Sequence, residues 1–158
     1  MTQEKKQEYT LKITQANKTQ MITILYEIII DYLDDAMDEI SLGQNADGEK
    51  SLLKAQSCLD ELIRSVNLHT DLGKNLHNIY IFSKKELIVS GVNHSLNRIW
   101  RVKKNMKTLH EAYRELEKKD KSGPMMDNTQ KVYAGLTYGK HSLNEDVTAA
   151  STNRGYVV

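Results

Sequence analysis

Five histidines and one cysteine are the residues of this chain best suited to metal binding or nucleophilic chemistry. Cys58 stands in an apolar helical pattern, and no neighbouring pattern supplies the base that a nucleophilic cysteine requires. We therefore interpret Cys58 as a small buried hydrophobic residue. The histidines lack the i,i+4 spacing and the acidic partners of metal ligands, and we expect them in loops or on the surface; they are His69, His77, His94, His110 and His141.

Five carboxylates crowd into the segment 31–39 and form a second candidate site. A di-iron centre in a helical bundle also needs Glu-x-x-His motifs on two further helices. None of the four histidines before residue 120 follows a glutamate by three positions, so this motif is absent. We interpret Asp34, Asp35, Asp38 and Glu39 as one solvated helix face. Residues 135–139 also lack the lysine and the helix of a phosphate-binding loop. The sequence therefore predicts no enzyme activity, no catalytic residues, no metal and no cofactor.

The composition narrows the class of protein. The 158 residues carry 22 Lys and Arg against 21 Asp and Glu, a formal net charge of +1. Nucleic-acid binding needs a concentrated basic surface, so this balance argues against nucleic acid as the main partner. The single cysteine cannot form an internal disulfide, the N-terminus does not resemble a signal peptide, and the longest apolar run is about half a membrane span. We expect a cytoplasmic protein without stable membrane insertion.

Residues 17–43 form the helix around which the chain is organised. Asn17 and Gln20 predict a capping box at its start, and Gly43 predicts a left-handed residue at its end. Two apolar stripes run side by side along this helix. We interpret the first stripe as core and the second as surplus apolar surface. The first contains Met21, Leu25, Ile28, Tyr32, Ala36 and Ile40, and the second contains Ile22, Tyr26, Ile29, Leu33 and Met37.

Three further helices are predicted at about 47–68, 71–90 and 95–119, with Gly91 ending the second of these and Asn93 or Ser95 capping the third. Short loops between four helices predict an all-α fold, an antiparallel up-and-down four-helix bundle over residues 17–120. The buried face of helix 71–90 is predicted to contain Leu72, Leu76, Ile79, Tyr80, Leu87 and Ile88.

Two segments flank this bundle. Residues 1–16 form a polar N-terminal arm, and the spacing of Tyr9, Leu11 and Ile13 fits a short strand or a flexible tether, which either frays or docks on the bundle. Residues 121–158 form a mostly irregular C-terminal extension that is more apolar than a disordered tail usually is. We expect residues 132–138 either to occupy the apolar groove in competition with a partner or to pack elsewhere as a permanent part of the fold.

Short motifs in a fixed order resemble the flagellar export chaperone family FliS over roughly residues 9–118. The family's usual proline at the first helical position is Lys18 here, and its usual acidic residue three positions after the cap is Gln20. The motifs are the cap followed by Leu25-Tyr26-Glu27, then Lys54-Ala55-Gln56 with Glu61-Leu62, then Asn75-Leu76 with Ile79-Tyr80.

The resemblance implies a helical chaperone that binds the disordered C-terminal segment of flagellin, prevents its premature polymerisation and delivers it for export, with the export apparatus as a further partner. The surplus stripe would accept an amphipathic or extended apolar segment. The alternative is a non-enzymatic structural or regulatory bundle that forms a homodimer through the same surface. The predicted contacts with flagellin are Ile22, Tyr26, Ile29 and Leu33, with Tyr9 and Ile13 as a movable cover.

Overall fold

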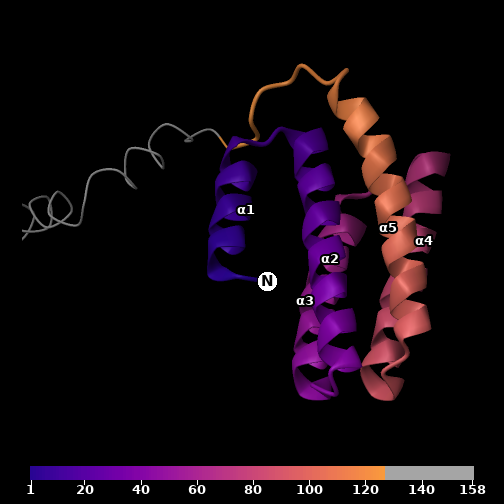
Figure 1. Ribbon diagram of the computed structural model, residues 1–158. Coiled ribbons are helices and arrows are strands. Elements are labelled where there is room, and N and C mark those ends of the chain that lie inside the picture. The colour runs from indigo at the N-terminus through magenta and orange to yellow at the C-terminus, as the bar shows by residue number, and fades with distance from the viewer. Residues whose placement is uncertain (127–158) are drawn as a thin grey trace, which may run out of the picture. The chain divides into compact units, whose positions relative to one another are not determined.

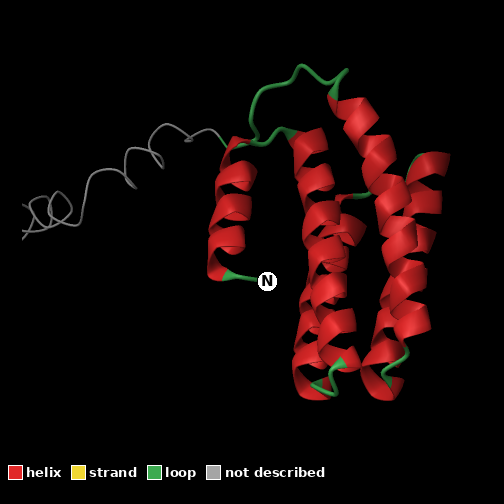
Figure 2. Ribbon diagram, viewed as in Figure 1, coloured by secondary structure: helices red, strands yellow, loops and turns green. Residues whose placement is uncertain are grey.

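The computed structural model describes residues 1–126, which contain five α-helices and no strand (Figures 1 and 2). The predicted all-α class is confirmed, and each end of the four predicted helices lies within three residues of its expected position. The prediction for residues 132–138 concerns a segment outside the described residues. The helices are α1 (Gln3–Gln15), α2 (Lys18–Ser41), α3 (Asn45–Ser65), α4 (Asp71–Asn93) and α5 (Leu96–Glu117).

Helix α2 contacts more of the other helices than any of them does. It packs against α3 and α5, and α1 lies along another of its sides (Figure 1). Helix α4 packs against α3 and α5, diagonally across from α2. The connections 42–44, 66–70 and 94–95 are short, so that each helix from α2 to α5 runs opposite to the one before it. This arrangement leaves one side of α2 for α1 alone.

The main core lies where α2, α3, α4 and α5 meet. Burial of a large aliphatic side chain there contributes roughly 1.5–3 kcal/mol to folding. The hydroxyl groups of Tyr26 and Tyr80 form a hydrogen bond inside this core, and burial raises the pKa of Tyr80 to about 12. The α2 residues of the core are Ile22, Tyr26, Ile29, Leu33, Ala36 and Ile40; its largest contributors from other helices are Leu52, Leu59, Leu62, Tyr80, Leu87, Ile99, Val102 and Met106.

The N-terminal arm is a docked helix, and its interpretation as a strand or tether is wrong. Thr2 caps α1 by accepting a hydrogen bond from the backbone N–H of Lys5. Tyr9, Ala16 and Ile24 of α2 form a second buried cluster, separate from the main core. A helix of about 13 residues is marginal in water by itself, so this cluster stabilises α1. Partly buried Met1, Ile13, Met21 and Ile28 pack against it.

The ends of α2 are as predicted. Asn17 Oδ1 accepts from the N–H of Gln20 at 2.8 Å, and Gln20 Oε1 accepts from the N–H of Asn17 at 2.9 Å, which confirms the capping box. Gly43 adopts a φ of +76°. Its N–H donates to Ile40 O, and the N–H of Gln44 donates to Glu39 O, the pair of bonds that closes a helix at a left-handed glycine.

Two predictions for α4 are wrong. The helix continues through Gly91, and His94 takes the left-handed conformation instead (φ 54°), its N–H donating to Ser90 O. Leu72 and Ile88 are exposed rather than buried. The reason is that small or paired polar residues, Ser83 and Glu86 among them, occupy buried positions of α4 and turn several of its apolar residues outward.

Candidate functional site

Four of the predicted flagellin contacts lie in the main core. Ile22 is 8% exposed, and Tyr26, Ile29 and Leu33 are completely buried. The interpretation of their stripe as surplus surface is therefore wrong. The core stripe continues through Ala36 and Ile40 with alternating spacings of 4 and 3, which keep residues on one side of a helix. The stripe that begins at Met21 has three spacings of 4 in succession and drifts around the helix.

The other two predicted residues, Tyr9 and Ile13, cover a different side of α2. Tyr9 is buried against Ile24, and Ile13 packs at the edge of the same cluster. The surface beneath them belongs to Met21, Ile24 and Ile28, on the side of α2 that the main core does not use. The structure therefore brings Tyr9 and Ile13 together, but over a set of α2 residues that sequence reasoning did not select.

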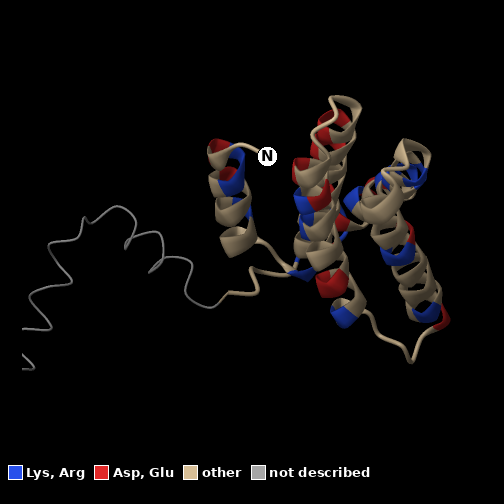
Figure 3. Ribbon diagram, turned by 90° about the horizontal axis from the view of Figure 1, so that it is seen from below, with Lys and Arg blue, Asp and Glu red and all other residues tan. Residues whose placement is uncertain are grey.

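Polar contacts attach α1 to an acidic row on α2 formed by Glu27, Asp31 and Asp35, each four residues from the next. Figure 3 shows acidic positions, in red, on the helices beside α1. The hydroxyl of Tyr9 donates to Asp31 Oδ2 at 2.5 Å, and Lys5 Nζ lies 2.7 Å from the same oxygen. The N-terminal ammonium of the chain pairs with Asp35. Burial, followed by the bond to Asp31, raises the pKa of Tyr9 above its usual range.

The acidic segment of α2 is consequently not one solvated face. Asp35 is engaged by the N-terminus, Asp34 pairs with Lys103 of α5, and the Oγ of Ser51 donates to Glu39 at 2.7 Å. These carboxylates contact three different segments, the N-terminus before α1, helix α5 and helix α3, and hold them around α2. They are therefore structural partners for cations and hydroxyls of the same chain.

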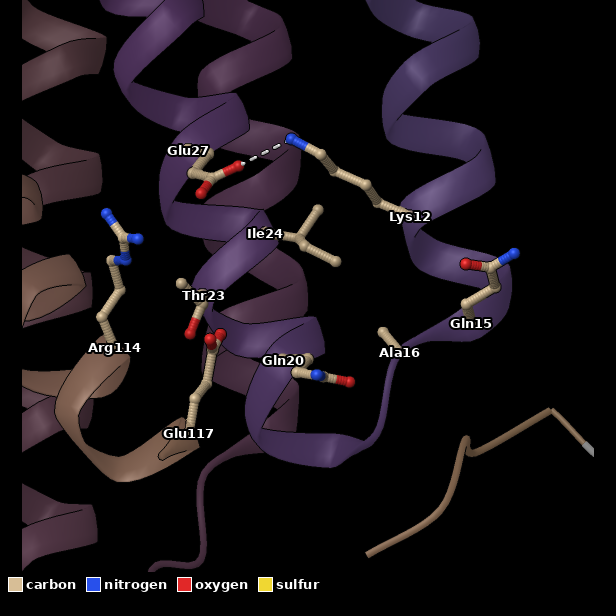
Figure 4. Close-up of a pocket in the computed structure, with 9 residues that line it drawn as sticks. All are labelled: Lys12, Gln15, Ala16, Gln20, Thr23, Ile24, Glu27, Arg114 and Glu117. Atoms are coloured by element: carbon tan, nitrogen blue, oxygen red, sulfur yellow. Dashed lines mark ion pairs between the residues drawn. The ribbon is translucent and has the colours of Figure 1, made fainter. Parts of the chain in front are cut away.

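A cavity of about 320 Å³ opens beside the α1–α2 contact (Figure 4). In Figure 4, Ile24 points from α2 toward α1, while Lys12 extends across the gap to Glu27. The Lys12 Nζ lies 3.5 Å from Glu27 Oε2. Most of the side chains around this space are polar. It is lined by Lys12, Gln15, Ala16, Gln20, Thr23, Ile24, Glu27, Arg114 and Glu117.

A second cavity, of about 260 Å³, has a more apolar lining and lies at the start of α2. Ile22 borders it, so one predicted contact residue reaches open space here. Leu72 and Tyr113 also line it; sequence reasoning assigned Leu72 to the core and gave Tyr113 no role at a site. Their convergence depends on the 66–70 connection, which no local pattern specifies. The remaining lining residues are Lys18, Thr19, Ser65, Val66, Asn67, Thr70, Gly73, Leu76 and Tyr80.

Residues 120–125, the strap, cross the junction between α1 and α2. The N–H of Met125 donates to Ala16 O at 2.9 Å, and Asn17 Nδ2 donates to Ser122 O at 3.2 Å. Thr19 donates its hydroxyl to Asp120. Hydrogen bonds from the Ser122 hydroxyl, from Thr19 and from the Ser122 backbone hold the pKa of Asp120 at about 2. The strap is thus hydrogen-bonded to the linker between α1 and α2.

Comparisons with known proteins agree with this architecture. Among residues 1–126, no helix combines the length and the apolar character needed to cross a membrane. No curated protein matches the chain. The family model described as flagellar protein FliS matches residues 1–120, which include all five helices. The resemblance drawn from the sequence motifs is thereby confirmed, and the chain belongs to the FliS family of flagellar chaperones.

Proposed function

We propose that this protein binds the disordered C-terminal segment of flagellin in the cytoplasm, prevents its premature polymerisation and delivers it to the flagellar export apparatus. The observation that carries this proposal is the second apolar side of α2. Met21, Ile24 and Ile28 face away from the main core, and a single short helix covers them. An amphipathic client helix placed there would bury the same surface.

Helix α1 is suited to act as a cover that the client displaces. Its buried cluster contains only three residues. The side chains of Lys5 and Lys12 that pair with α2 are more than 40% exposed, and exposed ion pairs contribute about 0–1 kcal/mol each. Opening α1 also breaks the Tyr9–Asp31 hydrogen bond and the pair between the N-terminal ammonium and Asp35. It still costs less than opening the main core, which contains many more buried side chains. In this proposal residues 1–16 are the cover and residues 17–120 are the chaperone domain, an antiparallel four-helix bundle that stays folded.

The client would pay for ordering itself and for displacing α1, so its affinity is expected to be lower than the buried area suggests. The apolar cavity beside Ile22 and Leu72 lies at the N-terminal end of α2. In this proposal the cavity accepts one large apolar side chain of the client. No catalytic step is involved.

Calorimetric titration with a peptide of the flagellin C-terminal segment tests the proposal. A 1:1 complex is expected, and Ile28→Ser should weaken it about tenfold because an apolar contact worth about 1.4 kcal/mol is lost. Leu42→Ser is the matched control, since Leu42 is exposed in the α2–α3 turn. Circular dichroism must show both variants folded. Absence of binding, or equal affinity in the two variants, would refute the assignment, and a dimer that ignores the peptide would favour the homodimeric alternative.

A further inference from the structure

The outer side of α4 carries a group of exposed apolar side chains. Phe82, Ile88, Val89 and Val92 are 50%, 48%, 40% and 80% exposed. Leu53 of α3, 61% exposed, extends this group. Contacts from Lys84 to Asp60 and from His94 to Glu49 set the register of the two helices. Glu49, Leu53 and Asp60 share one side of α3, so Leu53 lies opposite the α4 segment that holds Ile88 and Val92. We call these five apolar residues the α4 patch.

Between positions 81 and 92, α4 buries mostly polar residues and exposes mostly apolar ones. Three of its four buried positions there are Ser83, Glu86 and Ser90, whereas most of its exposed positions are apolar. Folding alone favours the opposite arrangement, because an apolar side chain gains its stabilisation when it is buried. A contiguous exposed apolar surface of this kind marks an interaction site.

The charges around the α4 patch are predominantly positive. Lys85 is exposed in its midst, and no carboxylate of the described residues lies within ion-pair distance of it. Glu86 is shared by Arg98 at 2.5 Å and Arg101 at 2.9 Å, which leaves one positive charge in excess. Asp60 is already paired with Lys84 at 2.6 Å, and Glu49, on the Leu53 side of α3, contacts the His94 ring at 3.0 Å. The complement of this surface is an apolar stripe bordered by carboxylates.

We propose that the α4 patch binds an amphipathic, acidic helix of a partner protein other than the flagellin client. A second copy of this chain fits less well, because two-fold pairing of α4 would bring Lys85 toward its own counterpart. The patch lies on a helix that packs against α3 and α5, whereas α1 packs against α2. Client and partner therefore bind at the same time.

Two synthetic peptides test the proposal on the full-length protein. Each is an amphipathic helix of about 18 residues, or five turns, with an identical leucine stripe; one has glutamates beside the stripe and the other has lysines. The glutamate peptide should bind more tightly and should shift the amide resonances of residues 81–92. Lys85→Glu should reverse this preference, so that the lysine peptide binds more tightly. In each protein the affinities of the two peptides should differ about threefold, as for an exposed ion pair. Equal binding of both peptides, or no binding, refutes the proposal.

Val89→Asn should weaken the glutamate peptide about tenfold, while Leu42→Asn, an exposed leucine outside the patch, should leave it unchanged. Sedimentation and a flagellin titration test whether the patch instead binds a second copy of this chain or the flagellin client. A protein that sediments as a dimer and becomes monomeric with Val89→Asn assigns the patch to a second copy. A flagellin peptide that shifts residues 81–92 and displaces the glutamate peptide assigns it to the client. Either result overturns the proposal, and neither depends on whether Ile28 contacts flagellin.

Discussion

Replacing Tyr9 with phenylalanine should loosen α1 without disturbing the core. The ring remains buried against Ile24, and only the hydroxyl that donates to Asp31 is lost. A hydrogen bond to a charged group contributes about 1.5–3 kcal/mol. Asp31 is partly exposed and keeps Lys5 as a partner, so the lower end of this range, about 1.5 kcal/mol, applies. The open population of α1 should therefore rise about tenfold.

A tenfold larger open population has two measurable consequences. Amide hydrogen exchange in α1 should become about tenfold faster, while exchange in α3 and α5 stays the same. If the flagellin peptide binds only the open form, its apparent affinity should also tighten about tenfold. Tyr32→Phe is the control, because Tyr32 lies on α2 and packs at the edge of the main core, away from α1.

The reasoning fails in two distinguishable ways. If Tyr9→Phe weakens flagellin binding, the Tyr9 hydroxyl contacts the client and α1 is part of the binding surface. If α1 exchange accelerates while flagellin affinity stays the same, α1 opens independently of binding, and the side of α2 beneath it is not the site. Equal effects in the Tyr32→Phe control would show that the loss of any tyrosine hydroxyl perturbs the fold.

Three further predictions concern single groups. Asp120 has a pKa of about 2 in the folded chain, well below its ordinary value of about 3.9. Its contacts therefore stabilise the strap fully above about pH 4 and are lost as the pH falls toward 2. Carboxyl NMR should show a titration midpoint near this pKa, and Thr19→Val should raise the pKa because one hydrogen bond to the carboxylate is lost. Ser83 Oγ is buried and has no hydrogen-bond partner within the described residues. Ser83→Ala should therefore raise the free energy of unfolding, measured by urea titration, by about 1 kcal/mol. A decrease in this free energy would show that the hydroxyl has a bound water. Burial raises the pKa of the Cys58 thiol to about 11, so iodoacetamide at pH 8 should modify the native protein at least tenfold more slowly than the urea-unfolded chain.

The features that sequence reasoning predicted correctly are set by residues close together in the chain. The capping box of Asn17 and Gln20 and the left-handed turn at Gly43 are completed within a few positions, so their chemistry is legible without the fold. The four long helices follow for the same reason, since their apolar periods extend over many turns. Even here His94, rather than Gly91, ends α4, because a histidine can adopt a left-handed conformation at moderate cost.

The features that it missed depend on which elements meet. Both stripes of α2 are apolar, and only the packing of α3 and α5 shows that Ile22 and Ile29 are core while Ile24 and Ile28 are not. The α1 helix was missed because its composition is polar and its stability comes from contacts with Asp31 and Ile24. Where both sides of a helix are apolar, periodicity indicates burial but leaves the partner of each side undetermined.

The strap links the cover to the part of the chain that follows α5. If α1 rotates away from α2, the backbone must turn at Ala16. Ala16 is extended, and its carbonyl accepts from the N–H of Met125. Asn17 remains fixed, since it caps α2 and its amide also bonds Ser122. Rotation of α1 therefore leaves the strap's hydrogen bonds to Asn17 and Thr19 intact and strains only the bond between Met125 and Ala16. The family match ends at residue 120, where the strap begins, so most of this restraint on α1 lies outside the region that the family model describes.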